Sequence, residues 1–388
     1  MTGRLAIVDG LRGFALFGIL VVNLLLFAHP LGTTLDSIAT GPLDAIVARL
    51  IHGVFEGKFY PLFSFLFGFG LAVQLERGGA EPTRLRRRYF RRMIGLLVLG
   101  LAHAVFFFAG DILVSYALLG FVLWRWRERE EWRLERLAVG LLAVGCVLSL
   151  FTGLAAAFGE NDPAAQADLQ AASAEALAAY QGTFAEATAQ RVRDLALLAL
   201  LTPLFAWPVA LAMFAMGLAA GRAGLLNDSA RLPEIVGLRG RTIVALAVSG
   251  NVLYALFADS TAWWPLTAIA LGALPLSGPL LAYIYVRLLW SWVERSPGHW
   301  LVRALQAAGR MSLSNYLLQG VACSLIFGGY GLGLHGELGP AALFGIAVAL
   351  YSTQLALSAL WLRRLNIGPM EWLLRAFTYL HRPETGKT

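Results

Sequence analysis

Residues 11–28 read LRGFALFGILVVNLLLFA, a run in which only Arg12 and Asn23 are polar. About 20 such residues cross the apolar core of a bilayer as a helix. The run is too long for a signal-peptide core and has no small-residue cleavage site after it, so we expect a retained transmembrane helix. Of the 388 residues, 58% are hydrophobic and only 14% are charged, against about 25% charged in soluble proteins. The composition excludes a soluble enzyme and predicts an all-α, polytopic membrane bundle.

The chain contains ten apolar segments long enough, or nearly long enough, to serve as spans. They lie near 11–29, 59–75, 93–109, 112–124, 137–158, 195–220, 241–258, 264–286, 311–328 and 340–361. The fourth is short, and 43–54 is expected to form a re-entrant or surface helix. We therefore predict about 10 transmembrane helices in a single integral-membrane domain, 1–388. Its N-terminal helices, 1–136, carry most of the polar motifs, and 222–388 forms a C-terminal region.

Arginine placement predicts the orientation of these spans. Arginines fill the loops after the second, fourth, sixth, eighth and tenth segments, whereas the alternate loops are poor in basic residues. By the positive-inside rule both termini are cytoplasmic. The net charge of +7 then reflects basic loops and not nucleic-acid binding. The alanine-rich, acidic stretch 159–193 is expected to be extracytoplasmic, either as an amphipathic helix or as a loop.

Polar residues inside the first and third segments are candidates for function, because such groups are costly in a bilayer. Asp9 and Arg12 are three apart and can pair on one helix face, which would also suit a simple cytoplasmic anchor. Asn23 lies about 16 Å further along the helix. His103 in the third segment is expected at a similar depth, near the midplane, as a catalytic residue or as a structural hydrogen-bonding one.

A second polar group is expected at the outer end of the second segment, in Phe55-Glu56-Gly57-Lys58. The chain has 29 arginines but only two lysines, Lys58 and Lys387, so Lys58 indicates a need for a compact ammonium group. It could pair with Glu56 or Asp111, bind an anionic substrate, or simply fix helix ends. Asp111, in a tight turn, is expected level with Lys58.

The C-terminal half carries two further polar motifs. Arg310 precedes Asn315 and Gln319, which at i, i+4 form a polar stripe on one helix face. Gly368-Pro369-Met370-Glu371-Trp372 is typical of the start of a short amphipathic helix, for which structural packing is a sufficient account. The chain has no P-loop, HExxH or CxxC pattern, and Cys146 and Cys323 lie in apolar runs. We therefore expect no metal and no bound cofactor.

Five of these motifs, in order along the chain, resemble the YeiB-like family of bacterial inner-membrane proteins, which has a C-terminal domain of unknown function. They are Asp9 to Asn23, Glu56 to Gly68, Gly110 to Leu113 with Tyr116, Gly309 to Gln319 and Gly368 to Trp372. The family looks like a branch of a transmembrane acyltransferase superfamily. Its sugar O-acyltransferases have an arginine in the first span and a catalytic histidine eleven residues later. Arg12 matches the arginine, but Asn23 stands in place of the histidine, as in the heparan-alpha-glucosaminide N-acetyltransferase branch. His29 and His52 in the next loop are out of register with that branch's histidine.

The resemblance implies acyl transfer from cytoplasmic acyl-CoA, as co-substrate, to an extracytoplasmic or lipid-linked acceptor such as a sugar. His103, Asn23 and Asp111 would form the catalytic group, and Glu56, Lys58, Asn315 and Gln319 would bind substrate. Arg12, Arg91, Arg92 and Arg310 would bind the phosphates of the donor. Asp9, Glu371 and Trp372 would be structural. A transporter or flippase of a small or lipid-linked anionic substrate is the alternative reading, and a non-catalytic membrane scaffold is a third.

Overall fold

The computed structural model describes residues 2–77, 82–159, 163–225, 231, 240–260 and 263–380. Within these residues every regular element is helical, so the predicted all-α fold is confirmed. The long helices are α1 (Thr2–Ala28), α3 (Phe59–Arg77), α4 (Pro82–Phe106), α6 (Glu131–Gly159), α8 (Phe184–Arg222), α9 (Gly240–Phe257), α10 (Trp264–Arg295) and α13 (Pro340–Arg364). The other helices are α2 (Pro42–Leu50), α5 (Ile112–Arg125), α7 (Pro163–Gln181), α11 (Trp300–Arg310), α12 (Ser312–Phe327) and α14 (Pro369–Tyr379), with the short turns η1 (Asp36–Ile38) and η2 (Ile51–Phe55).

All ten apolar segments correspond to helices. Eight helices among the described residues are long and apolar enough to cross a membrane, and two shorter apolar helices, α5 and α12, accompany them. Pro203 and Pro208 lie within α8, and Pro275 and Pro279 within α10, without ending either helix. The chain is therefore a polytopic helical membrane protein.

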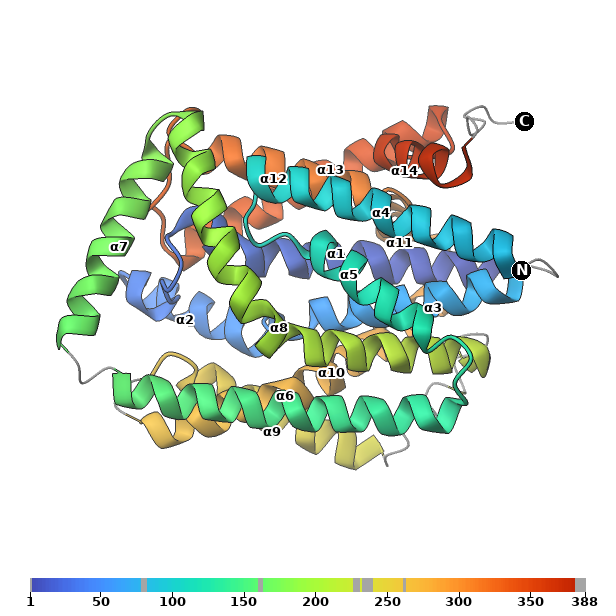
Figure 1. The fold of residues 1–388 in the computed structure, drawn as a ribbon, viewed down its shortest axis with the longest axis horizontal. Helices are drawn as coiled ribbons and strands as arrows, with labels where there is room; N and C mark the ends of the chain where they lie inside the picture. Colours follow the sequence, from blue (N-terminus) through green and yellow to red (C-terminus); the bar gives the residue numbers. More distant parts are fainter. Residues whose placement is uncertain are drawn as a thin grey trace.

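The bundle is arranged around α1, which runs through its centre (Figure 1). α11 lies antiparallel along the first half of α1. Gly13 lies against the Leu305 carbonyl, and Gly309 lies against the Asp9 carbonyl. α3 packs on α8 through a similar close approach, in which Gly68 faces the Phe214 carbonyl. α6 and α9 form an outer layer against α10. Small residues thus bring the helix backbones together, as is usual in membrane proteins.

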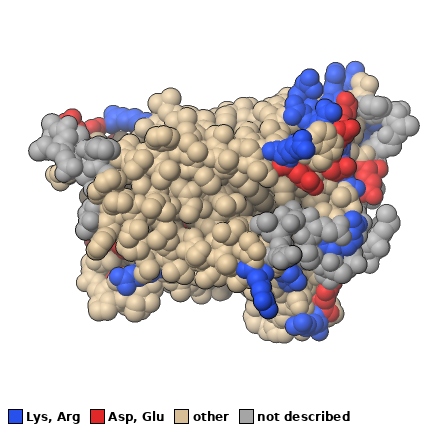
Figure 2. All heavy atoms as spheres, turned by 90° about the horizontal axis from the view of Figure 1, so that it is seen from below, with Lys and Arg blue, Asp and Glu red and all other residues tan. Residues whose placement is uncertain are grey.

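Charged residues mark the two ends of the bundle. The start of α1 and helix α14 lie at one end (Figure 1), where most of the Lys and Arg side chains visible in Figure 2 gather. A broad face without charged side chains separates this arginine-rich end from the opposite end. The described parts of the arginine-rich loops lie at the same end, as expected when every second loop is basic. By the positive-inside rule that end is expected to face the cytoplasm.

The opposite end is covered by α7. Thr183 begins α8 with a capping box to Glu186, so the expected 159–193 segment contains one complete helix and the first turns of another. The Tyr180 carbonyl accepts a hydrogen bond from Gly329 N, which fastens α7 to the loop after α12.

One span is interrupted in its middle. Residues 43–54, expected as a re-entrant or surface helix, form α2 and η2, which together with α3 make one candidate span, Pro42–Glu76, by length and composition. The interruption at Glu56-Gly57-Lys58 lies next to Phe59, whose ring packs on Gly18 near the middle of α1. Glu56 and Lys58 therefore lie near the centre of the bundle and not at the outer end of a span, where the sequence pattern placed them.

Candidate functional site

The interruption is built from a π turn and a glycine. η2 is a single π-helical stretch, after which Glu56 is extended and Gly57 has φ of 75°, a conformation that only glycine adopts without strain. A side chain on Gly278 of α10 would collide with the Gly57 carbonyl, 2.2 Å from the position of its Cβ. The buried Lys58 side chain turns back, and its Nζ donates to the His52 carbonyl over 2.7 Å. The Lys58 side chain thus provides a hydrogen bond to a carbonyl of the π turn, that of His52.

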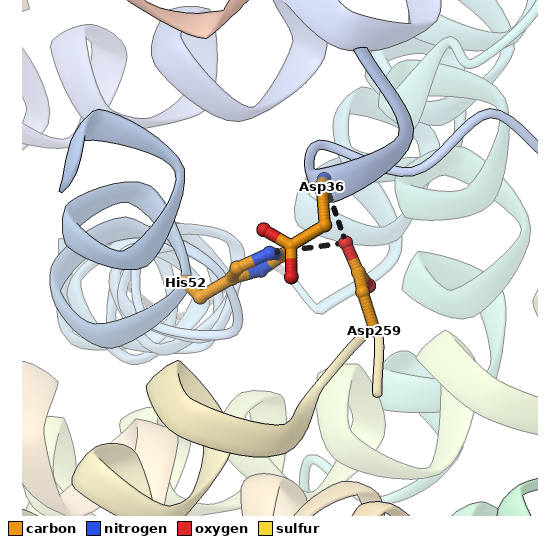
Figure 3. Close-up of side chains that lie close together, drawn as sticks. All are labelled: Asp36, His52 and Asp259. Carbon is orange, nitrogen blue, oxygen red and sulfur yellow. Dashed lines mark hydrogen bonds and ion pairs between the residues drawn. The ribbon is translucent and has the colours of Figure 1, made fainter. Parts of the chain in front are cut away.

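His52 stands at the centre of a polar network that the sequence motifs did not predict. Its Nδ1 lies 2.9 Å from Oε2 of Glu56, and the same oxygen accepts a hydrogen bond of 2.8 Å from the Tyr254 hydroxyl on α9. His52 Nε2 lies 3.2 Å from Oδ2 of Asp259, and that oxygen also accepts from the backbone N–H of Asp36 (Figure 3). Burial raises the pKa of Asp259, but the adjacent His52 and the hydrogen bonds from the Asp36 N–H and the Thr34 side chain together lower it below the ordinary value. The i, i+4 spacing of His52 and Glu56 is the one sequence signal that pointed to this network.

His103 and Asp111 form a buried pair at the junction of α4 and α5. His103 is in the last turn of α4, and its Nδ1 lies 2.7 Å from Oδ2 of Asp111. The other oxygen of Asp111 accepts from Val114 N over 3.0 Å and so caps α5. His103 Nε2 lies against Gly320 of α12 and has no hydrogen-bond partner among the described residues. The carboxylate therefore orients the imidazole while one ring nitrogen is left unused.

A cavity of about 360 Å³ lies beside this pair, between α1, α3, α5 and α8. Asn23 and Asp111 both line it, together with Tyr60 and Ser115. Since Phe59 and Ile112, the first residues of α3 and α5, also line it, two helices begin at its wall. Helix N-termini carry partial positive charge, so this part of the wall favours negative charge.

The cavity is separated from an apolar groove nearer the arginine-rich end. The groove, of about 520 Å³, lies between α1, α10, α11 and α13, and Phe14 and Phe17 line it. Phe55 and Phe59 line the cavity. Ring pairs close the space between the two hollows: Phe14 with Phe59 at 5.2 Å and Phe17 with Phe55 at 5.8 Å between centroids. Four aromatic rings are thus the partition between the two hollows.

Asn315 and Gln319 do not line the cavity. Asn315 Nδ2 donates to the Ser358 hydroxyl over 2.9 Å, and Gln319 Nε2 donates to the side-chain carbonyl of Gln354 over 2.9 Å. Both residues are buried between α12 and α13. The predicted polar stripe is real, but it joins two helices and does not line the cavity.

The remaining candidates lie at the arginine-rich end. Arg12 pairs with Asp9 at 3.7 Å, and Arg310 donates to the Asn366 carbonyl. Glu371 accepts from the backbone N–H groups of Leu313 and Ser314, at 2.7 and 3.1 Å, so it caps α12 as well as lying in the first turn of α14. Three further candidates, Arg91, Arg92 and Trp372, are half-buried on α4 and α14. The structure therefore places Asn23 and Asp111 at the cavity, with His103 hydrogen-bonded to Asp111, and leaves the arginines at one end.

A second buried network at the opposite end was also missed. Arg191 of α8 is 3% exposed, and it donates to the Phe106 carbonyl at 3.0 Å and to the Tyr330 hydroxyl at 2.6 Å. Asp194 accepts from the Tyr180 hydroxyl and from Gln190. The sequence signal that was available for this network is Arg191 itself, an arginine at the end of an otherwise acidic segment. This network holds the end of α4, and hence His103, in place.

These features define a polytopic helical membrane protein with charged residues and a cavity at its centre. Residues 220–381 match a family model described as a protein of unknown function, DUF418. The chain belongs to the family of the YeiB and YxaH proteins, as the resemblance in its motifs predicted.

Three curated relatives match over nearly their whole length. The uncharacterized protein YxaH of Bacillus subtilis is 33% identical over 97% of this chain and 94% of its own. The uncharacterized protein YeiB of Escherichia coli is 31% identical over 95% of each chain. An uncharacterized 39.9 kDa protein encoded in the amylase 3' region of Bacillus acidopullulyticus is 25% identical over 97% of this chain and 94% of its own. No solved structure matches the chain.

Proposed function

We propose that the protein is a membrane-bound acyltransferase of the bacterial inner membrane. It moves an acyl group from cytoplasmic acyl-CoA to an extracytoplasmic or lipid-linked acceptor, such as a sugar hydroxyl. The observation that carries this proposal is the His103–Asp111 pair, at 2.7 Å, beside a cavity that Asn23 also lines.

Asp111 is the member of the pair that lines the cavity. The Asp111 carboxylate is fully covered in this structure, so the cavity wall at Asp111 has to open before an acceptor hydroxyl gives its proton to the His103–Asp111 pair. The acceptor oxygen forms a bond to the thioester carbonyl carbon, and the C–S bond breaks. The sulfur takes the proton from the pair and leaves as the free thiol of coenzyme A. Asn23 donates to the oxyanion that develops on the carbonyl oxygen, and the N-termini of α3 and α5 favour that charge.

The donor would approach from the arginine-rich end. Arg91, Arg92 and Arg310 would bind the phosphates of acyl-CoA, and Arg12 lies beside Gly70 at the same end. The acyl group would then follow the apolar groove lined by Phe14 and Phe17. The four aromatic rings between groove and cavity form the barrier that it has to pass.

The test is thioester turnover by the full-length protein in detergent. We expect acetyl-CoA or another short-chain acyl-CoA to raise the melting temperature saturably and to release free thiol slowly. His103→Gln and Asp111→Asn should abolish thiol release while the melting temperature still responds to the donor. His29→Gln is the matched control, because His29 is similarly buried and, among the described residues, its ring hydrogen-bonds only the Leu338 carbonyl. Full activity in both His103→Gln and Asp111→Asn would refute the mechanism.

A transporter is the second candidate, and the interrupted span favours it. Transporters often place half-helix N-termini at a central binding site, and α3 and α5 begin at the cavity wall. Glu56 and His52 would then relay protons along the break. Uptake of a labelled anion into proteoliposomes, without thioester consumption, would favour this candidate over acyl transfer.

A further inference from the structure

We propose that Asp36, His52 and Asp259 bind a zinc ion at the opposite end of the bundle (Figure 3). The three residues come from separate parts of the chain: the turn η1, the π turn η2 and the connection between α9 and α10. One ligand atom from each lies within 4.8 Å of the other two. The site is independent of acyl transfer, since none of the three residues lines the central cavity.

His52 is prepared as a ligand. It is 4% exposed, and its buried Nε2 makes no well-formed hydrogen bond among the described residues but lies 3.2 Å from Oδ2 of the Asp259 carboxylate, close enough for an ion pair. Its Nδ1 is held by Glu56 at 2.9 Å, and Glu56 is held in turn by Tyr254. A carboxylate that accepts from Nδ1 fixes the tautomer in which Nε2 carries a free lone pair, which is the usual support behind a zinc-bound histidine.

The His52–Asp259 distance and the donor types fit zinc. Tetrahedral zinc binds histidine nitrogen and carboxylate oxygen at about 2.0–2.1 Å, which puts neighbouring ligand atoms roughly 3.3 Å apart. His52 Nε2 and Asp259 Oδ2 are 3.2 Å apart. Calcium and magnesium prefer oxygen ligands alone. Two carboxylates balance the charge of the ion, and the exposed Asp36 leaves the fourth position to water.

The competing account is a protonated His52 shared between Glu56 and Asp259, with no metal. The two accounts differ in their response to chelator and zinc. A histidinium ion pair gains nothing from added zinc and loses nothing to EDTA. A zinc site that joins three segments stabilises the folded state by mass action, because the unfolded chain does not hold its ligands together.

The experiment uses tag-free, full-length protein in detergent. Its zinc content is measured after gel filtration by inductively coupled plasma mass spectrometry. We expect about one zinc ion per chain, a lower melting temperature in EDTA, and recovery when zinc is added. Asp36→Asn should lose the zinc while remaining folded, because Asp36 is exposed and uses only its backbone N–H to hold Asp259. Glu56→Gln should weaken zinc binding about 10- to 100-fold.

His299→Ala is the control, since His299 is exposed and lies outside the proposed site. It should retain the zinc. The proposal is overturned if wild-type protein contains no zinc and its melting temperature does not change on zinc addition. It is equally overturned if zinc persists undiminished in Asp36→Asn and His52→Ala, which would make the bound metal adventitious.

Discussion

His103 and Asp111 are eight residues apart, on either side of a change in chain direction, and Nδ1 and Oδ2 meet at 2.7 Å. The contact closes the junction between α4 and α5, because Asp111 also caps α5 through Val114 N. One carboxylate therefore serves both the imidazole and a helix terminus, and its removal has two separate consequences.

Replacing Asp111 by alanine should lower the free energy of unfolding by about 1–3 kcal/mol, because a buried imidazole N–H loses its partner and α5 loses its cap. Asp111→Asn keeps a side-chain oxygen for Val114 N and should cost less. Thermal unfolding in detergent measures both. Equal stability of Asp111→Ala and wild type would show that the pair contributes nothing to folding.

Gly68→Ala should destabilise the bundle by about 1–3 kcal/mol, as overpacked substitutions do. The new Cβ would lie 2.0 Å from the Phe214 carbonyl oxygen, so α3 and α8 would have to separate. Gly140→Ala on α6 is the matched control, because nothing lies within 4 Å of its Cβ position. That change should be neutral or stabilising by up to about 1 kcal/mol, and a similar loss at both positions would contradict this account.

Acid should weaken the fold through His335. Burial lowers its pKa to about 4, from the ordinary value of 6.5. Between these values the unfolded chain binds more protons than the folded one, so stability falls as pH drops from 6.5 to 4 and His335 contributes no further change below that. The loss is at most about 3 kcal/mol. His335→Gln, which can still donate to the Phe27 carbonyl, should flatten the pH dependence of the melting temperature, and an unchanged slope would refute the assignment.

Glu371→Ala should loosen the start of α12. Its carboxylate accepts from the N–H groups of Leu313 and Ser314, and loss of such a cap costs about 1 kcal/mol. We expect faster hydrogen exchange in the first turn of α12 and unchanged exchange in the middle of α13. Glu371→Gln keeps one acceptor oxygen and should show a smaller increase; protection equal to wild type in Glu371→Ala would contradict the capping role.

Hydrophobic length and composition were sufficient to predict the helices, because every span must bury its backbone hydrogen bonds within itself. They could not predict the interruption at Glu56-Gly57-Lys58. Two charged residues between apolar runs are typical of the membrane–water interface. Inside the bundle Glu56 is stabilised by the Tyr254 hydroxyl and Lys58 by the His52 carbonyl, contacts that the apolar pattern does not show.

The candidate site was predicted only in part. The sequence pattern placed His103 near the midplane with Asn23, and Asp111 at the outer end, whereas His103 lies in the last turn of α4 and its side chain contacts Asp111 at 2.7 Å. The contact between His103 and Asp111 depends on where α4 ends and α5 begins, which apolar runs do not mark. Asn315 and Gln319 were indistinguishable from substrate ligands in sequence, because a buried amide needs a hydrogen-bond partner whether that partner is a substrate or Gln354.

The length of α5 has a consequence for the surrounding lipid. Its 14 residues measure about 21 Å, roughly 9 Å less than the apolar thickness of a bilayer. This hydrophobic mismatch falls on the side where α5 begins, above the cavity. There α8 supplies the cavity wall, through residues such as Leu195, Leu198 and Trp207. For the proposed acyl transfer, this predicts that a lipid-linked acceptor enters sideways from the leaflet without first passing through water.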